Sequence, residues 1–184
     1  MSGRGSPAGR RERELLEAVA EAFRGRGYRT YLDPDGTDYF DLAVRRDEEV
    51  GLVEGKLAAA SEVLAQALVR RPWADWVGVV LGSERAAERL VARTGGRRSE
   101  RVGVWSFADG RLRELRAARP GHLPGGGDPF SETRSQLRRT LEALDRGELP
   151  SAVRWSGVLG EVRRTSAGRR YREWRLDELA APGD

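Results

Sequence analysis

The sequence predicts an α/β sandwich in which a central mixed β-sheet is flanked by helices. Three observations predict it: an amphipathic helical pattern near the start, two strand-like runs joined by a short charged segment, and a nearly continuous apolar run typical of a strand covered on both faces. Helical patterns alternate with the later strand-like runs. The sheet is therefore expected to begin as an antiparallel meander and to continue through helical connections.

The elements follow from hydrophobic spacing and turn residues. Apolar residues at helical spacing predict a first helix from Glu12, stopped by Gly25 and Gly27. A strand over 28–32 follows and ends in turn-forming residues at 33–36. Strands over 39–45 and 49–57 are expected to pair as a hairpin. After them the sequence predicts a helix capped by Ser61 and ending near Pro72, strand 76–81, a helix capped by Ser83, strand 102–107 and strand 112–115.

Composition divides the chain into four parts. Residues 1–11 are rich in Gly, Ser, Pro and Arg and read as a disordered basic tail, and residues 12–118 hold the main domain. Residues 119–130 contain three consecutive glycines and predict a flexible Gly/Pro linker. Residues 131–184 predict a helix and a hairpin over 153–163 and 169–176. Such a small module would be marginal alone, so it is expected to dock on the main domain or on a partner.

Missing residue types narrow the chemistry. The chain has no cysteine, which excludes disulfides, thiolate nucleophiles and Cys-based metal sites. Its one histidine, His122, lies among loop-forming residues and reads as a linker residue. Catalysis would then rest on groups such as carboxylates and lysine, and carboxylates without histidine favour hard cations such as Mg²⁺. With no long apolar run and no signal-peptide pattern, we expect a cytoplasmic protein without a membrane partner.

The charges add a second constraint. There are 33 basic and 29 acidic side chains, a net charge of +4. This excess suits local contact with phosphates and would equally suit many proteins with no nucleic-acid role. Lys56 is the only lysine. A GC-rich coding bias explains the scarcity, but the exception indicates a site that needs a compact ammonium whose pKa can be tuned.

Three charged residues form the candidate site. Glu54 and Lys56 are two apart on an expected strand, so their side chains leave the same face of the sheet. Asp41 lies on the preceding strand and can point to that face beside Glu54. Two carboxylates so placed can hold one or two divalent cations, and an ammonium can hold or activate a water that attacks a phosphate. The alternative is that Asp41 ends a strand in solvent and Glu54 and Lys56 form a surface pair.

The pattern resembles that of a known superfamily of nucleases. Phe40-Asp41, followed thirteen residues later by Glu54-Gly55-Lys56, resembles the PD-(D/E)xK superfamily, which includes restriction endonucleases and Holliday-junction resolvases. The resemblance covers roughly residues 12–107. It implies a restriction endonuclease-like core that acts on DNA, with RNA not excluded. It also implies that Asp41, Glu54 and the Gly55 carbonyl bind Mg²⁺ or Mn²⁺, and that Lys56 serves the nucleophilic water.

The sequence also departs from that pattern and offers further candidates. Phe40 stands where proline is usual, and Gly55 replaces an apolar residue. This glycine indicates either a close approach of backbone to ligand or a degenerate site. Gln66 resembles a helical glutamine that contacts the active site in several branches of the superfamily, so the resemblance gives it a catalytic role. The alternative is a solvated helix face, because Glu62, Gln66 and Arg70 are spaced four residues apart along one side of the helix. Glu17 is an accessory candidate, with Glu14 and Glu21 as competitors.

The C-terminal hairpin gathers arginines between aromatic residues, which predicts a nucleic-acid-binding surface. The alternative is an edge hairpin kept soluble by its charge. The arginines assigned to this surface are Arg163, Arg164, Arg169, Arg170 and Arg172.

The combined hypothesis is a metal-dependent endonuclease that hydrolyses DNA. The rival is a catalytically inactive nuclease-fold protein that binds DNA or a protein partner. A homodimer is left open, because cutting both strands of a duplex can need two copies of the site.

Overall fold

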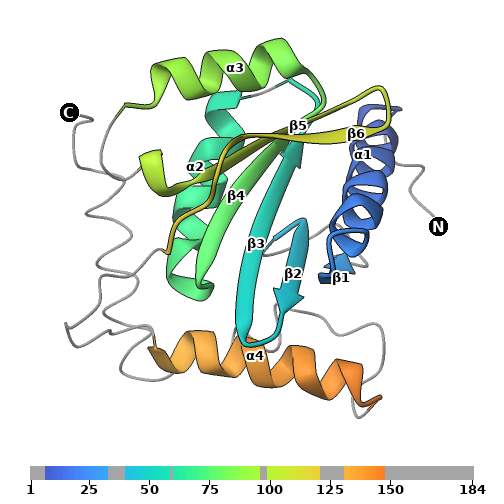
Figure 1. The fold of residues 1–184 in the computed structure, drawn as a ribbon, viewed down its shortest axis with the longest axis vertical. Coiled ribbons are helices and arrows are strands. Elements are labelled where there is room, and N and C mark those ends of the chain that lie inside the picture. Colours follow the sequence, from blue (N-terminus) through green and yellow to red (C-terminus); the bar gives the residue numbers. More distant parts are fainter. Residues whose placement is uncertain (1–6, 33–39, 59, 96–98, 121–130, 148–184) are drawn as a thin grey trace.

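The protein is described from a computed structural model, which defines residues 7–32, 40–58, 60–95, 99–120 and 131–147. One six-stranded mixed sheet, in the order β1-β2-β3-β4-β5-β6, forms the centre of these residues, and helices lie on both of its faces (Figure 1). This confirms the α/β sandwich expected from the sequence.

The strands pair in sequence order. β1–β2, β2–β3 and β5–β6 are antiparallel, whereas β3–β4 and β4–β5 are parallel and are connected through helices. The predicted meander followed by helical connections is confirmed. The strands are β1 (Arg29–Leu32), β2 (Leu42–Arg46), β3 (Glu49–Lys56), β4 (Trp76–Leu81), β5 (Gly103–Ala108) and β6 (Arg111–Arg116). The helices are α1 (Pro7–Arg24), α2 (Ala60–Arg70), α3 (Glu84–Arg93) and α4 (Ser131–Asp145), with 3₁₀ turns η1 (Arg71–Trp73) and η2 (Ser99–Arg101).

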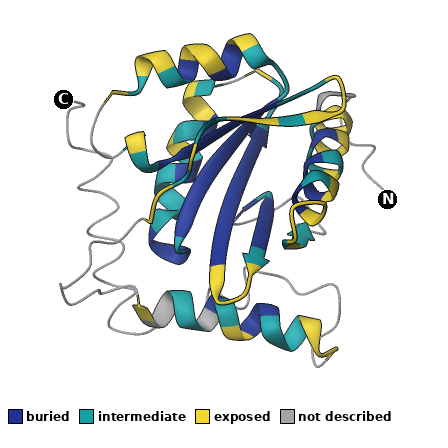
Figure 2. Ribbon diagram, viewed as in Figure 1, coloured by how far each residue is buried: buried dark blue, intermediate teal, exposed yellow. Residues whose placement is uncertain are grey.

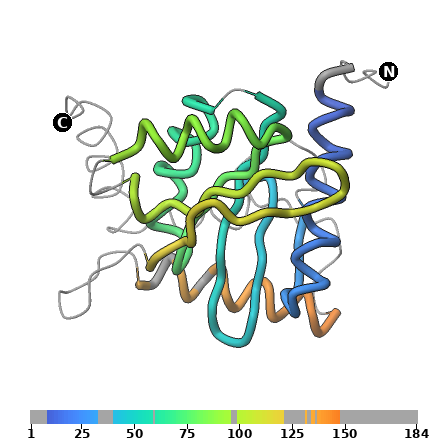
Figure 3. Tube along the Cα trace, turned by 45° about the horizontal axis from the view of Figure 1, so that its top comes forward, coloured from blue at the N-terminus to red at the C-terminus, as the bar shows by residue number. Residues whose placement is uncertain are grey.

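Two apolar clusters lie on the two faces of the sheet. On one face α1 packs through Leu15, Val19 and Phe23 against side chains such as Val53 and Trp105. On the other face α2, α3 and α4 share a cluster with the opposite side of the same strands. The central strands are accordingly the most buried part of the molecule (Figure 2). The β5–β6 hairpin reaches toward α1 (Figure 3). Just after α1, Arg26 donates to the Leu112 carbonyl at 2.6 Å.

Gly78 makes room for an indole ring in the centre of the sheet. A Cβ at this position would lie 2.2 Å from Cζ3 of Trp105, on the neighbouring strand β5. Trp105 lies in contact with Trp76 and Phe23, with ring centroids 5.9 and 5.7 Å away. A glycine that weakens a strand locally therefore allows a large aromatic cluster to form beneath α1.

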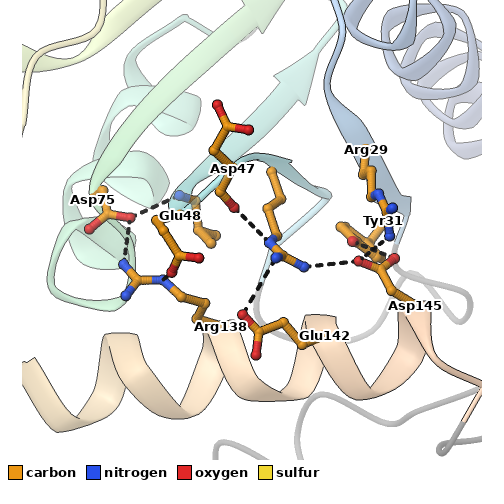
Figure 4. A network of polar contacts seen from close by, with 10 residues as sticks. Arg29, Tyr31, Asp47, Glu48, Asp75, Arg138, Glu142 and Asp145 are labelled. Carbon is orange, nitrogen blue, oxygen red and sulfur yellow. Dashed lines mark hydrogen bonds and ion pairs between the residues drawn. The ribbon is translucent and has the colours of Figure 1, made fainter.

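Helix α4 docks beside the turn of the β2–β3 hairpin through charged groups (Figure 4). Asp145 accepts from the Tyr31 hydroxyl at 2.8 Å and from Arg45 at 2.9 Å, and it also pairs with Arg29 at 2.7 Å. Leu137 and Leu141 are fully buried beneath this network. Helix α4, the only described part of the predicted C-terminal module, thus packs on the main domain. Residues 121–130 of the predicted linker and the predicted hairpin over 153–176 lie outside the described residues.

Two local predictions were wrong. α1 begins at Pro7, so residues 7–11 are helical and only 1–6 of the predicted tail lie outside the described residues. Proline is well suited to a first helical turn, and alanine and arginine, at positions 8, 10 and 11, are good helix formers. Ser61 lies inside α2, which begins at Ala60, and is therefore not its N-cap. Ser83 does cap α3, accepting from Ala86 N at 3.4 Å.

Within the described residues, no helix combines the length and the apolar character needed to cross a bilayer.

Candidate active site

Asp41 and Glu54 lie opposite one another across the β2–β3 hairpin. Leu42, the first residue of β2, pairs with Val53, and Asp41 immediately precedes it, so the same register places Asp41 beside Glu54. Glu54 shares its face of β3 with Leu52, which belongs to the cluster under α2. The two acids therefore converge on the α2 side of the sheet.

The two carboxyl groups are held by different partners. Oδ2 of Asp41 accepts from the Gly55 amide at 2.8 Å. Oε1 of Glu54 accepts from Nε of Arg70, on α2, at 3.2 Å. Each of the two carboxyl groups also affects the pKa of the other. Glu54 is only 3% exposed, so this acid is buried between Asp41 and a guanidinium.

Burial and mutual repulsion change the ionisation of both acids. Burial, and then the charge of Asp41, raise the pKa of Glu54 to about 8, against the opposing effects of Arg70 and Lys56. Burial also raises the pKa of Asp41, although the Gly55 amide and Lys56 act in the other direction. Two close carboxyls share a proton because both cannot ionise cheaply together.

Lys56 meets an acid from the other side of the sheet. Its Nζ lies 3.1 Å from Oε2 of Glu12, on α1. Burial alone would lower the pKa of Lys56, but the hydrogen bond and charge of Glu12, with the charges of Asp41 and Glu62, raise it above its ordinary value. The side chains of Lys56 and Glu12 are 22% and 30% exposed, so the site opens to solvent on their side. Lys56 therefore carries its positive charge at neutral pH.

Glu12, a first-helix acid that the sequence analysis did not name, is the one that contacts Lys56. The predicted accessory residue, Glu17, is exposed and pairs with Arg13 at 3.1 Å, away from the contact that α1 makes with Lys56. Leu16 lies between these two acids in sequence and packs over Gly55, where a Cβ would lie 2.7 Å from its Cδ2. Gly55 thus permits a close approach of α1 rather than of a ligand, and this approach brings Glu12 to Lys56.

The polar stripe of α2 faces the acids and not solvent alone. Arg70 contacts Glu54, and the charge of Glu62 acts on Lys56. Gln66 lies one helical turn from each of these two residues on the same stripe. Its Oε1 is buried and, within the described part of the chain, accepts no hydrogen bond. A buried acceptor without a donor is costly unless a ligand completes it.

The donor set fits a hard cation. The described residues contain no group of three or more His, Cys, Asp and Glu side chains placed to hold a metal ion, so two carboxylates need further oxygens. The Gln66 oxygen is one. The Gly55 carbonyl is another, because in an extended strand the carbonyl and the amide of one residue point to the same side, and the Gly55 amide faces Asp41. Two carboxylates with an amide and a backbone carbonyl suit Mg²⁺ or Mn²⁺.

One surface hollow, of about 470 Å³, lies beside α4 and the β2–β3 turn. Its walls include Arg29, Arg45, Glu142 and Asp145, and the candidate site residues do not line it. These groups already pair with one another, so the hollow reflects how α4 docks. The arginines assigned to nucleic-acid binding, Arg163, Arg164, Arg169, Arg170 and Arg172, lie outside the described residues.

Comparisons with protein-family models, with curated proteins and with solved structures found no match to this chain.

Proposed function

We propose that this protein is a metal-dependent nuclease with a restriction endonuclease-like core, which hydrolyses phosphodiester bonds in DNA. The observation that supports it best is the convergence of Asp41 and Glu54 across a hairpin, with the chain's one lysine two residues further on the same strand. The order of elements from α1 to β4 also agrees with such a core. DNA is named as substrate from the resemblance of the sequence motif.

In this proposal the residues of the site have different roles. Asp41, Glu54, the Gly55 carbonyl and Gln66 would hold Mg²⁺ or Mn²⁺, which polarises a phosphate oxygen and lowers the pKa of a bound water. Lys56 remains charged and supplies positive charge where the phosphate becomes more negative in the transition state. Glu12 orients the ammonium of Lys56 through their 3.1 Å contact.

Nicking of supercoiled plasmid with Mg²⁺ or Mn²⁺ tests the proposal. Asp41→Asn and Lys56→Ala should each reduce cleavage at least about a thousandfold, because each removes a group required in the transition state. Glu12→Gln should cost about 10- to 100-fold, as expected of a group that orients another. Glu17→Gln is the matched control on the same helix and should cut like the wild type.

Two outcomes would contradict the proposal. Equal residual cleavage in all variants would identify a contaminating nuclease. DNA binding that survives with no cleavage under any metal would favour the rival, a nuclease-fold protein that binds DNA without cutting it.

A further inference from the structure

Arg70 lies on the same carboxylate that the proposed nuclease needs for its metal. Its Nε contacts Oε1 of Glu54 at 3.2 Å, and its side chain is only 19% exposed. Glu54 is itself almost fully buried. The ion pair is therefore shielded from solvent and far less screened than a surface pair.

The guanidinium cannot change its charge to accommodate a cation. Arginine stays protonated throughout the working range of proteins, so it can only move away or remain beside the metal and repel it. Arg70 is thus a fixed positive charge beside Glu54, and Gln66, one turn earlier on the same helix, has a buried Oε1 that accepts no hydrogen bond from the described residues.

We propose that Arg70 is a built-in counterion of Glu54 that competes with the divalent metal and sets how tightly this site binds it. The inference rests on the proposed metal site, and it assigns a role to a residue beyond the hydrolytic group. In the metal-free protein Arg70 compensates the negative charge that Asp41 and Glu54 keep between them. On metal binding it has to release Glu54.

Removing the Arg70 guanidinium should change the metal affinity of the site in a predictable direction. Removing the guanidinium also favours a proton on Glu54, which opposes metal binding. A divalent cation carries twice the charge of the proton that it replaces, so the loss of a fixed positive charge favours the metal more than the proton. A variant without this charge should therefore bind metal more tightly.

The test is the Mn²⁺ affinity of the full chain, measured from the electron paramagnetic resonance signal of free Mn²⁺ and requiring no cleavage. Arg70→Met keeps much of the apolar stem and removes the charge, and it should bind Mn²⁺ about tenfold or more tightly than the wild type. Arg70→Lys keeps the charge and should stay close to the wild type. Arg85→Met removes an exposed arginine of α3 and matches the change in net charge.

Circular dichroism spectra establish that each variant is folded before its affinity is compared. If Arg70→Met binds Mn²⁺ no more tightly than Arg85→Met, while Asp41→Asn abolishes binding, the competition is refuted and the metal site stands. If Arg70→Lys gains as much affinity as Arg70→Met, the effect is one of packing and the inference is also overturned. If no folded variant binds Mn²⁺, the proposed metal site fails and the inference fails with it.

Discussion

Replacing Glu54 with glutamine should change how the stability of the metal-free protein depends on pH. Burial and the charge of Asp41 raise the pKa of Glu54 from 4.5 to about 8 in the folded chain. In the unfolded chain this carboxyl ionises near its ordinary value. Between about pH 4.5 and pH 8 the folded state therefore binds the additional proton, and the free energy of unfolding falls as the pH rises.

The magnitude follows from the width of that window. One proton corresponds to a slope of up to about 1.4 kcal/mol for each pH unit. Because Glu54 titrates together with Asp41, we expect the wild type to lose roughly 3 kcal/mol relative to Glu54→Gln between pH 5 and pH 9. Glutamine has nearly the same shape, can still accept from Arg70, and has no proton to lose.

Urea unfolding followed by tryptophan fluorescence, with EDTA present, measures both curves. The chain has five tryptophans, of which Trp73, Trp76 and Trp105 are buried in the described core. Glu17→Gln, an exposed acid replaced in the same way, should run parallel to the wild type across the whole range. If Glu54→Gln also runs parallel to the wild type, Glu54 ionises in the folded protein as it does in the unfolded chain, and the account of a shared proton is wrong.

Two further predictions concern metal affinity and packing. Mn²⁺ affinity should rise up to about tenfold for each pH unit until about pH 8 and then level off, because metal binding must displace the proton held by Glu54. Calorimetry in buffers of different ionisation enthalpy would detect the release of that proton, and an affinity that does not change with pH would contradict the prediction. Gly78→Ala should destabilise the fold by about 3 kcal/mol or more, because the new Cβ meets the rigid ring of Trp105. Gly55→Ala should cost only about 1 kcal/mol, because there the Cβ meets the flexible end of Leu16. Similar urea midpoints for the two variants would show that the sheet relaxes around both.

Hydrophobic period and turn chemistry were sufficient to predict the sheet. Apolar spacing separates helices from strands, and a short charged turn between two strand-like runs specifies a hairpin and brings Asp41 near Glu54. Even the fully buried strand Trp76–Leu81 was predicted with its observed bounds. These features are local, so one sequence carries them. The start of α1 was missed because its first turns pack little apolar surface.

The side chains that complete the site could not be predicted in this way. Glu12 and Glu17 lie five residues apart, which turns them by about 140° around the helix, but no local signal says which of them faces the sheet. The stripe of Glu62, Gln66 and Arg70 is polar and matches the pattern of a solvated face. Its contact with a buried acid depends on how α2 crosses β3, which is a property of tertiary packing. A buried carboxylate was the available signal, because Glu54 in a buried strand requires a positive partner.

The place of the site follows from where β2 ends. β3 pairs with β2 only up to Val53, whereas its pairing with β4 continues to Lys56. Among the described residues, no strand lies beside this edge of β3 from Glu54 onward, and the Asp41 side chain accepts from the Gly55 amide there. Two acids, an ammonium and a backbone carbonyl gather there because the shorter strand leaves this edge open, so lengthening β2 by pairing would close the site without changing any of its residues.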